Sequence, residues 1–312
     1  MRLDRVSEFM EKAGVPGRDL YDLPSSDKSF PDGCHYRIEF SGVEGPRVLE
    51  ALIKERRKRN IPIHRLVSFC QGGTLFDDAE LKDFAQMAAE DKMEVIAIPG
   101  PRLGWDIGRQ YTSSEGARCG MNLRGSDEIR KVIADLFRMY DLGMRGFMLV
   151  DLGVLALVKK MQEQGNFPKD VTIKLSVWAG MASAAGAILA EQTGANSFNP
   201  VSDLTLPQMA AIRKAVSISI DFYIWTFNSY GGENRIYDAH EAARIYAPCY
   251  FKFEPADGSS TTYSPFTHDA EHIALMVKKV KWAEWVINHV RENEPGMKLS
   301  EQGAPDLFLP KV

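Results

Sequence analysis

The sequence predicts a (β/α)8, or TIM, barrel, and three observations support this fold class. Eight short runs rich in β-branched and aromatic residues occur from residue 35 onward, as expected for buried strands. Helical stretches separate them, which implies parallel strands with right-handed crossovers. The first run continues into "FSGVEGPR" (40–47), which lacks the G-x-G-x-x-G turn of an open nucleotide-binding sheet. Eight such units therefore favour a closed barrel.

The elements follow one another in the order that a barrel requires. The predicted strands cover residues 35–42, 64–73, 93–100, 146–153, 171–180, 196–201, 218–228 and 249–255. The predicted helices, with apolar residues every three or four positions, cover 46–60, 79–92, 126–143, 154–165, 183–194, 206–216, 238–247 and 268–293. Ser126 and Thr205 are typical helix N-caps, and Gly143, Gly165 and Gly194 are typical helix ends. Residues 1–34 are predicted to form a helix and a clamp, residues 35–293 the barrel, and residues 294–312 a polar tail.

Composition narrows the functional classes. The chain has 312 residues, of which 45% are hydrophobic and 26% charged, as in ordinary soluble proteins. A net charge of −4 argues against a nucleic-acid partner. No apolar run approaches the roughly 20 residues that span a bilayer, and no signal peptide is recognised, so we expect a cytoplasmic protein without a membrane partner. The four cysteines, Cys34, Cys70, Cys119 and Cys249, lie far apart and favour reduced thiols over zinc or an iron–sulfur cluster.

Two of the predicted strands carry charges where parallel strands are normally apolar. Arg37 and Glu39 alternate with apolar residues in the first strand, and Lys252 and Glu254 do so in the last. Closing the barrel makes these strands neighbours, so the four charges are predicted to form one inward-facing cluster, with the glutamates nearest the catalytic end. A structural ion-pair plug is the alternative, and it suits the two deeper cations best. Buried ion pairs stabilise proteins little, which favours a functional role for the glutamates.

Other strands place further candidates at the same end. Asp151 closes the 146–153 run and is predicted to lie at the barrel mouth. Lys174 points inward from the 171–180 run, either as a counter-ion or as a Schiff-base lysine. Trp178 and Tyr223 could wall a substrate site or belong to the plain core.

Two loops carry residue types that suit an anionic substrate. The segment 99–125 is unusually long and contains Arg102 and Arg109, which would suit a carboxylate or phosphate, although a solvated loop would look the same. Asn228, Gly231 and Gly232 follow the seventh strand, where barrels often hold phosphate. Together with Arg37, Trp178 and Tyr223, these residues form the predicted substrate-binding set.

The stretch "GANSFNPVSDLTLPQMAAIRKAVSISIDFYIW" (194–225) resembles the collagenase-like peptidase family. A glycine–aliphatic strand, a Ser/Asp turn, a Leu-x-x-aliphatic-x-x-Ile-Arg helix and a hydrophobic strand follow one another in a similar way. The resemblance implies a barrel and a peptidase-like activity, and relatives include proteins of RNA and ubiquinone hydroxylation, some with an iron–sulfur cluster. The closely spaced cysteines of that family are absent here, so the resemblance does not extend to a cluster.

These features predict an enzyme that acts on a small anionic organic molecule by general acid/base chemistry. Glu39 and Glu254 would form the acid/base pair, helped by Asp151, and Lys174 and Lys252 would orient the substrate or stabilise an oxyanion. Lyase, isomerase and hydrolase chemistry all remain open. The candidates for a divalent metal are Glu39, Asp151, Glu254 and His268, and oxygen-rich ligation would favour magnesium or manganese.

The alternative is a non-catalytic ligand-binding barrel that works as a subunit of a larger assembly. The predicted helix 268–293 is apolar on two sides, which indicates two packing partners or a homodimer. Its predicted core stripe is Ile273, Val277, Val280 and Ile287, and the residues off this stripe are Trp282, Trp285, Val286 and His289.

Overall fold

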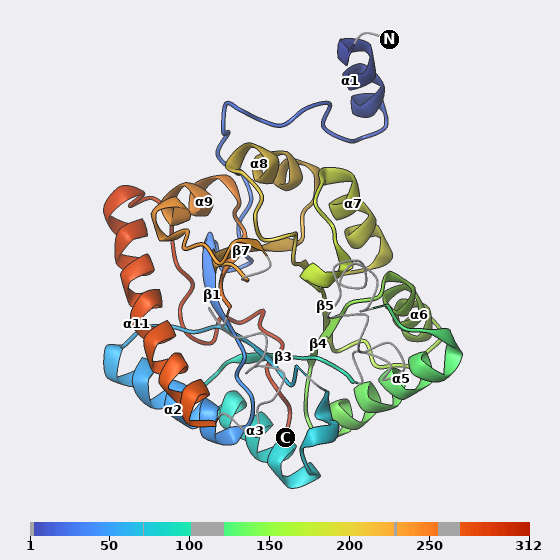
Figure 1. The fold of residues 1–312 in the computed structure, drawn as a ribbon, viewed down its shortest axis with the longest axis vertical. Coiled ribbons are helices and arrows are strands. Elements are labelled where there is room, and N and C mark those ends of the chain that lie inside the picture. The colour runs from blue at the N-terminus through green and yellow to red at the C-terminus, as the bar shows by residue number, and fades with distance from the viewer. Residues whose placement is uncertain (1–2, 71, 101–121, 228–229, 255–268) are drawn as a thin grey trace.

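The computed structural model describes residues 3–70, 72–100, 122–227, 230–254 and 269–312, and its strands form a closed parallel barrel. Each strand pairs with the next one along the chain, and β8 closes the ring on β1. Figure 1 shows the helices forming a ring around the strands. The predicted (β/α)8 fold is confirmed.

Every strand lies within a run that the sequence predicts, but most are shorter. The strands are β1 (Tyr36–Ser41), β2 (Arg65–Ser68), β3 (Glu94–Ala97), β4 (Gly146–Leu149), β5 (Thr172–Leu175), β6 (Ser197–Phe198), β7 (Ser219–Trp225) and β8 (Cys249–Phe253). The shortening has a local cause after β2, where Phe69 adopts a left-handed φ of 63° and turns the chain out of the sheet. Apolar residues thus continue beyond the strands into the loops at the barrel mouth.

The helices also lie where the apolar repeat predicts them. They are α1 (Leu3–Lys12), α2 (Pro46–Arg59), α3 (Asp78–Glu90), α5 (Gly125–Asp141), α6 (Leu152–Glu163), α7 (Ala184–Thr193), α8 (Leu206–Ala215), α9 (Ala239–Ile245) and α11 (Asp269–Asn293), with short 3-10 turns η1 (Gly73–Leu75), η3 (Val177–Ala179) and η5 (Ile236–Asp238). Thr205 caps α8 in a reciprocal pair with Gln208, as expected. Ser126 was wrongly predicted as a cap, because α5 begins one residue earlier, after Arg124. None of the helices in the described part of the chain is long and apolar enough to cross a membrane.

The buried face of α11 differs from the predicted stripe. Val277 is 37% exposed although it was placed in the core, and Val286 is fully buried although it was placed outside. Val280 and Ile287 are buried as predicted, but the stripe left out Lys279, which is fully buried together with Met276 and Ala283. A charged residue on the packed face therefore hid the true register of this helix.

The main hydrophobic core lies between the strands and the surrounding helices. The outward faces of the strands contribute side chains that are at most 1% exposed, such as Phe40, Leu66, Val95, Phe147 and Phe222. A smaller apolar cluster is separate from this core and consists of Val67, Cys70, Ile96, Ile98 and Met148. By strand alternation Val67, Ile96 and Met148 face the barrel interior, so the β2–β4 side of the interior is apolar near the mouth.

Asp135 of α5 fastens the loops that follow β2 and β3. Its carboxylate accepts hydrogen bonds from the amides of Gly73, at 3.0 Å, and Gly100, at 2.7 Å. The two loops approach so closely that a Cβ on Gly72 would lie 2.5 Å from the Cα of Gly100. Gly72 also has a φ of 90°, so only glycine fits this crossing without strain.

The segment before the barrel lies on its outside. Residues 18–28 run over α8 and α9, where the Lys28 ammonium donates to the carbonyl oxygens of Arg213 and Val216. The amide of Ser26 donates to the carbonyl of Arg244. Beyond this contact α1 stands away from the barrel and buries no side chain (Figure 1).

The last residues close the amino-terminal end of the barrel, opposite the mouth. Leu299 forms a bridge with Tyr36, and the Ser300 carbonyl accepts a hydrogen bond from the His64 ring at 2.9 Å. Burial lowers the pKa of His64 to about 3, which keeps the ring neutral, with its other nitrogen accepting the Ile38 amide. The tail is therefore part of the barrel floor.

Candidate active site

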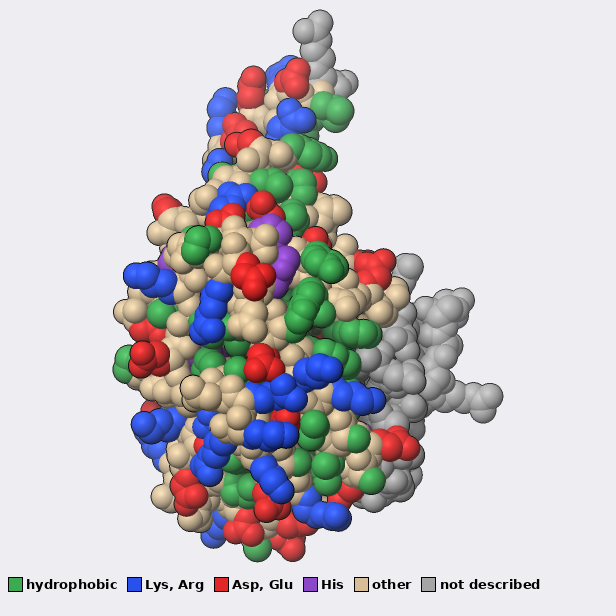
Figure 2. Space-filling view, turned by 90° about the vertical axis from the view of Figure 1, so that its left-hand side faces the viewer, with side chains coloured by type: hydrophobic (Ala, Val, Ile, Leu, Met, Phe, Trp, Pro, Cys, Tyr) green, Lys and Arg blue, Asp and Glu red, His purple; other side chains and the backbone are tan. Residues whose placement is uncertain are grey.

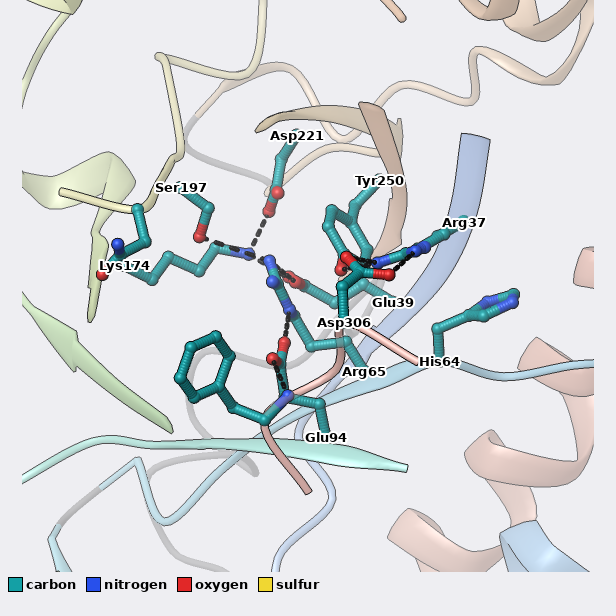
Figure 3. Close-up of polar contacts among 12 residues, drawn as sticks. Arg37, Glu39, His64, Arg65, Glu94, Lys174, Ser197, Asp221, Tyr250 and Asp306 are labelled. Carbon is teal, nitrogen blue, oxygen red and sulfur yellow. Dashed lines mark hydrogen bonds and ion pairs between the residues drawn. The ribbon is translucent and has the colours of Figure 1, made fainter. Parts of the chain in front are cut away.

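The inward faces of the strands carry a buried cluster of charged residues. Glu39 of β1 lies beside Lys252 of β8 and Arg65 of β2 in the strand register. Lys174 of β5 and Asp221 of β7 reach the same place from across the barrel (Figure 3). None of these side chains is more than 5% exposed. The barrel centre is thus an ion-pair network rather than an apolar filling.

Glu39 lies at the middle of this network. One carboxylate oxygen is 2.6 Å from the Lys252 ammonium, and the other contacts Lys174 and lies 3.7 Å from Arg65. Burial by itself would raise the pKa of Glu39, but the three neighbouring cations hold that pKa below its usual range. Glu39 is therefore ionised and both of its oxygens are occupied.

Asp221 has the opposite electrostatic character. Its carboxylate is 2.5 Å from Lys174 and 3.8 Å from Lys252. Burial and the neighbouring Glu39 carboxylate nevertheless raise the pKa of Asp221 to about 7. Two carboxylates thus share the lysines, and one of them retains its proton near neutral pH.

Replacing Asp221 with asparagine should change the pH dependence of stability. An unfolded aspartate titrates near about pH 4, whereas the folded pKa is about 7. The folded state therefore holds a proton that the unfolded state has lost, so stability falls as pH rises through this window. We expect Asp221→Asn to remove this fall, so between low and neutral pH the stability of the variant should gain about 4 kcal/mol relative to the wild type. Urea unfolding across this range checks it, and parallel curves for the two proteins would contradict it.

A second ion pair lies below the centre, toward the barrel floor. Arg65 contacts Glu94 of β3, and the other oxygen of Glu94 accepts the backbone amide of Phe308 at 2.9 Å. Arg37 also points to this end, where Asp306 binds its guanidinium at 2.6 and 2.9 Å. Arg37 is thus placed apart from the glutamates with which the sequence groups it. Its guanidinium lies over the Phe30 ring, 3.9 Å from the ring centroid.

Glu254 lies at the mouth of the barrel, because it directly follows β8 at the carboxyl end of that strand. Its carboxylate accepts the Ser41 hydroxyl at 2.8 Å and lies 3.1 Å from the Lys252 ammonium. Lys252 therefore joins Glu39 below to Glu254 above. Burial lowers the pKa of Lys252, but Glu39 and Glu254 outweigh this effect and raise it, so the lysine is charged. Tyr223 of β7 lies beside it, with its ring centroid 5.8 Å from the ammonium.

The remaining predicted residues are spread around the mouth or fall outside the described part. Asp151 caps α6, accepting the amides of Gly153 and Val154 at 2.7 and 3.2 Å. Trp178 lies in η3, where its ring packs against Phe227 and Tyr230. Gly231 and Gly232 form a turn with positive φ angles. The predictions on Arg102, Arg109, Asn228 and His268 lie outside the described residues.

The metal hypothesis has limited support from the geometry. In the ranges that the structure describes, no group of three His, Cys, Asp or Glu side chains could hold a metal ion. Among the predicted ligands, Glu39 is occupied by lysines, Glu254 binds Ser41 and Lys252, and Asp151 caps a helix. The described carboxylates are therefore arranged for hydrogen bonds and ion pairs.

Several members of the network were missed by the sequence argument. Arg65 and Glu94 begin their strands, where a charge is easily taken for the end of a loop. Asp221 was not among the predicted site residues. Its spacing of two residues before Tyr223 was the signal, because period-two alternation puts both side chains on one face. Lys279 was left out because it lies in a helix.

The fold and its polar interior define the class of protein: a TIM barrel with a buried, charged centre. Residues 121–230 match the model of Peptidase family U32, which confirms the resemblance to collagenase-like peptidases over this part of the chain. No curated protein matches the chain by sequence.

Solved structures share the fold at low identity. A proposed fructose-1,6-biphosphate aldolase from Coccidioides immitis has 12% identity and a TM-score of 0.51, with 93% of this chain and 96% of that chain covered. A U32 peptidase has 15% identity and a TM-score of 0.44, covering 76% and 98%. A dipeptide epimerase from Methylococcus capsulatus, complexed with Mg ion, has 15% identity and a TM-score of 0.41, covering 81% and 62%. At such identities the likeness concerns the fold alone.

Proposed function

We propose that this protein is an enzyme that transfers protons to and from a small anionic organic substrate at the barrel mouth. Glu254 is the acid/base group in this proposal. Its carboxylate lies where the strand ends of a TIM barrel place catalytic groups, and Ser41 and Lys252 fix its orientation. Lyase, isomerase and hydrolase reactions all use such a group, and the match to Peptidase family U32 favours hydrolysis among them.

The observation that carries the proposal is a pair of buried polar side-chain atoms in the barrel interior that lack hydrogen-bond partners among the described residues. Within the described residues, the Tyr223 hydroxyl and the Asn199 side-chain oxygen are buried and form no hydrogen bond. Strand alternation places both in the barrel interior. Burial raises the pKa of Tyr223 well above its usual value, so its hydroxyl can donate to a substrate oxygen. Unsatisfied buried groups are rare in proteins, and a polar substrate would satisfy these two.

In this proposal the buried ion pairs below Glu254 do not contact the substrate but influence the charge at the mouth. Glu39 and Lys174 bind each other and Asp221, so they set the charge around Lys252. Lys252 is the cation nearest Glu254, and it is suited to stabilise a developing oxyanion at the mouth. The anionic character of the substrate is proposed from Lys252 and from the arginines of the 99–125 segment. The apolar β2–β4 side would then face the uncharged part of the substrate.

Two substitutions test this function. Conversion of a panel of small organic acids and short peptides, followed by NMR, should be reduced at least about 100-fold in Glu254→Gln. Tyr223→Phe is the matched variant, because it removes a hydroxyl that no described residue binds. It should keep or raise the melting temperature while activity falls. Full activity in both variants would refute the assignment.

The alternative of a subunit in a larger assembly has its own structural support. The surface of α11 and η5 carries Trp285, which is 44% exposed, and Tyr237, which is 74% exposed. Their rings pack edge to face at 5.5 Å, and the His289 ring contacts both of them and His240. Figure 2 shows histidines beside hydrophobic side chains on this side of the molecule. We propose this patch as the contact of a homodimer in the cytoplasm. Sedimentation of Trp285→Ser should then show a monomer where the wild type shows a dimer.

A further inference from the structure

Lys279 is a fully buried lysine that the proposed reaction does not use. It lies on the packed face of α11, together with Met276 and Ala283, and has no exposed surface. Its ammonium donates a hydrogen bond of 2.5 Å to the carbonyl oxygen of Ser41. Ser41 is the last residue of β1, so α11 holds the mouth end of this strand through one lysine.

The same residue of β1 binds the candidate acid/base group. Ser41 offers its carbonyl to Lys279 and its hydroxyl to Glu254, at 2.8 Å. The amide of the next residue, Gly42, donates to the Val67 carbonyl at 3.1 Å, which fixes the strand end on its other side. A shift of this strand end would therefore move the hydroxyl away from Glu254.

A lysine in this place is costly for the fold. The pKa of Lys279 is lowered to about 7, mainly because the side chain is buried and also because Lys252 is near. Glu254, Cys70 and Glu44 act in the opposite direction but do not outweigh the burial. The unfolded lysine is charged up to about pH 10, so folding is opposed by its desolvation at neutral pH. A methionine would fill the same space without this cost. The lysine is therefore better explained by the site than by stability.

We propose that Lys279 is a positioning residue of the candidate site, which holds the end of β1 so that Ser41 stays aimed at Glu254. This inference rests on the proposed function for its purpose, but not for its test. The position of the strand end can be measured without any substrate.

Amide hydrogen exchange of residues 40–44 is the test. Lys279→Met should speed exchange in this segment at least tenfold, while the urea midpoint at neutral pH stays level or rises. Lys279→Arg and Lys279→Gln keep an N–H donor and should retain more of the protection. Lys278→Met, at an exposed neighbouring position on α11, is the matched control and should leave exchange unchanged.

The outcomes separate this inference from the proposed function. Unchanged exchange in Lys279→Met overturns the positioning role, even if Glu254→Gln abolishes activity. Faster exchange in every segment, with a lower urea midpoint, also overturns it, since Lys279 would then stabilise the whole fold. If Lys279→Met fails to fold, amide exchange in Lys279→Gln decides. Protection of residues 40–44 equal to that in the wild type supports the role. A loss of protection in this segment that only matches the loss of global stability refutes it.

Discussion

Lys174→Met is expected to destabilise the protein by about 3–5 kcal/mol, the range found when one partner of a buried ion pair is removed. The ammonium of Lys174 contacts Glu39 and Asp221 at once, and all three side chains have no exposed surface. Burial lowers the pKa of Lys174, while the two carboxylates raise it, so the lysine and its partners depend on one another. Without the lysine, the buried carboxyl groups of Glu39 and Asp221 would share Lys252, and only the more distant Arg65, 3.7 Å from Glu39, would add positive charge among the described side chains of the network.

Urea unfolding followed by circular dichroism measures this effect, and a double-mutant cycle identifies its cause. Lys174→Met combined with Asp221→Asn should recover part of the loss, because the second carboxylate is then neutral. Lys169→Met is a control at an exposed position near the start of β5, outside the network, and should change stability little. If Lys174→Met lowers the free energy of unfolding by less than about 1 kcal/mol, as expected for an exposed ion pair, the stabilising role of the buried network is contradicted.

The fold was predictable because each strand and helix follows a local pattern. The alternation of apolar runs with amphipathic stretches needs no knowledge of distant contacts, and it indicated every barrel strand. Strand lengths were overestimated because an apolar residue such as Phe69 continues the pattern after the backbone has turned. Loops that bury apolar side chains and strands that do so look alike in sequence.

The interior network was predictable only in part. Alternation placed Glu39, Lys174 and Lys252 inward, but it could not show which charges meet across the barrel. The contact of Lys174 with Asp221 joins residues 47 positions apart through the closure of the sheet. Lys279 escaped because helix patterns assume that lysines face water. Such a residue becomes visible only when the helix is docked on its neighbours.

Removing residues 296–312 is expected to have the largest effect of all, at least about 5 kcal/mol, because it leaves several buried groups unpaired at once. Arg37, which is 1% exposed, would lose both bonds to Asp306 and the 2.9 Å bond to Ser300. Glu94 would lose the Phe308 amide, and His64 the Ser300 carbonyl. The barrel floor would then open to water beneath the charged centre.

Deleting residues 1–12 is the control, since α1 also lies at a chain end but buries no side chain. We expect that deletion to leave the urea midpoint nearly unchanged, while the tail deletion abolishes cooperative unfolding or lowers the midpoint steeply. Asp306→Asn, which keeps the tail but weakens its ion pair with Arg37, should lie between them at about 1–3 kcal/mol. Equal midpoints for the two truncated proteins would show that the tail only covers the floor. An intermediate value for Asp306→Asn would instead locate much of the effect in Arg37, whose buried guanidinium is paired with the carboxylates of Asp306 and Asp32 at that end of the barrel.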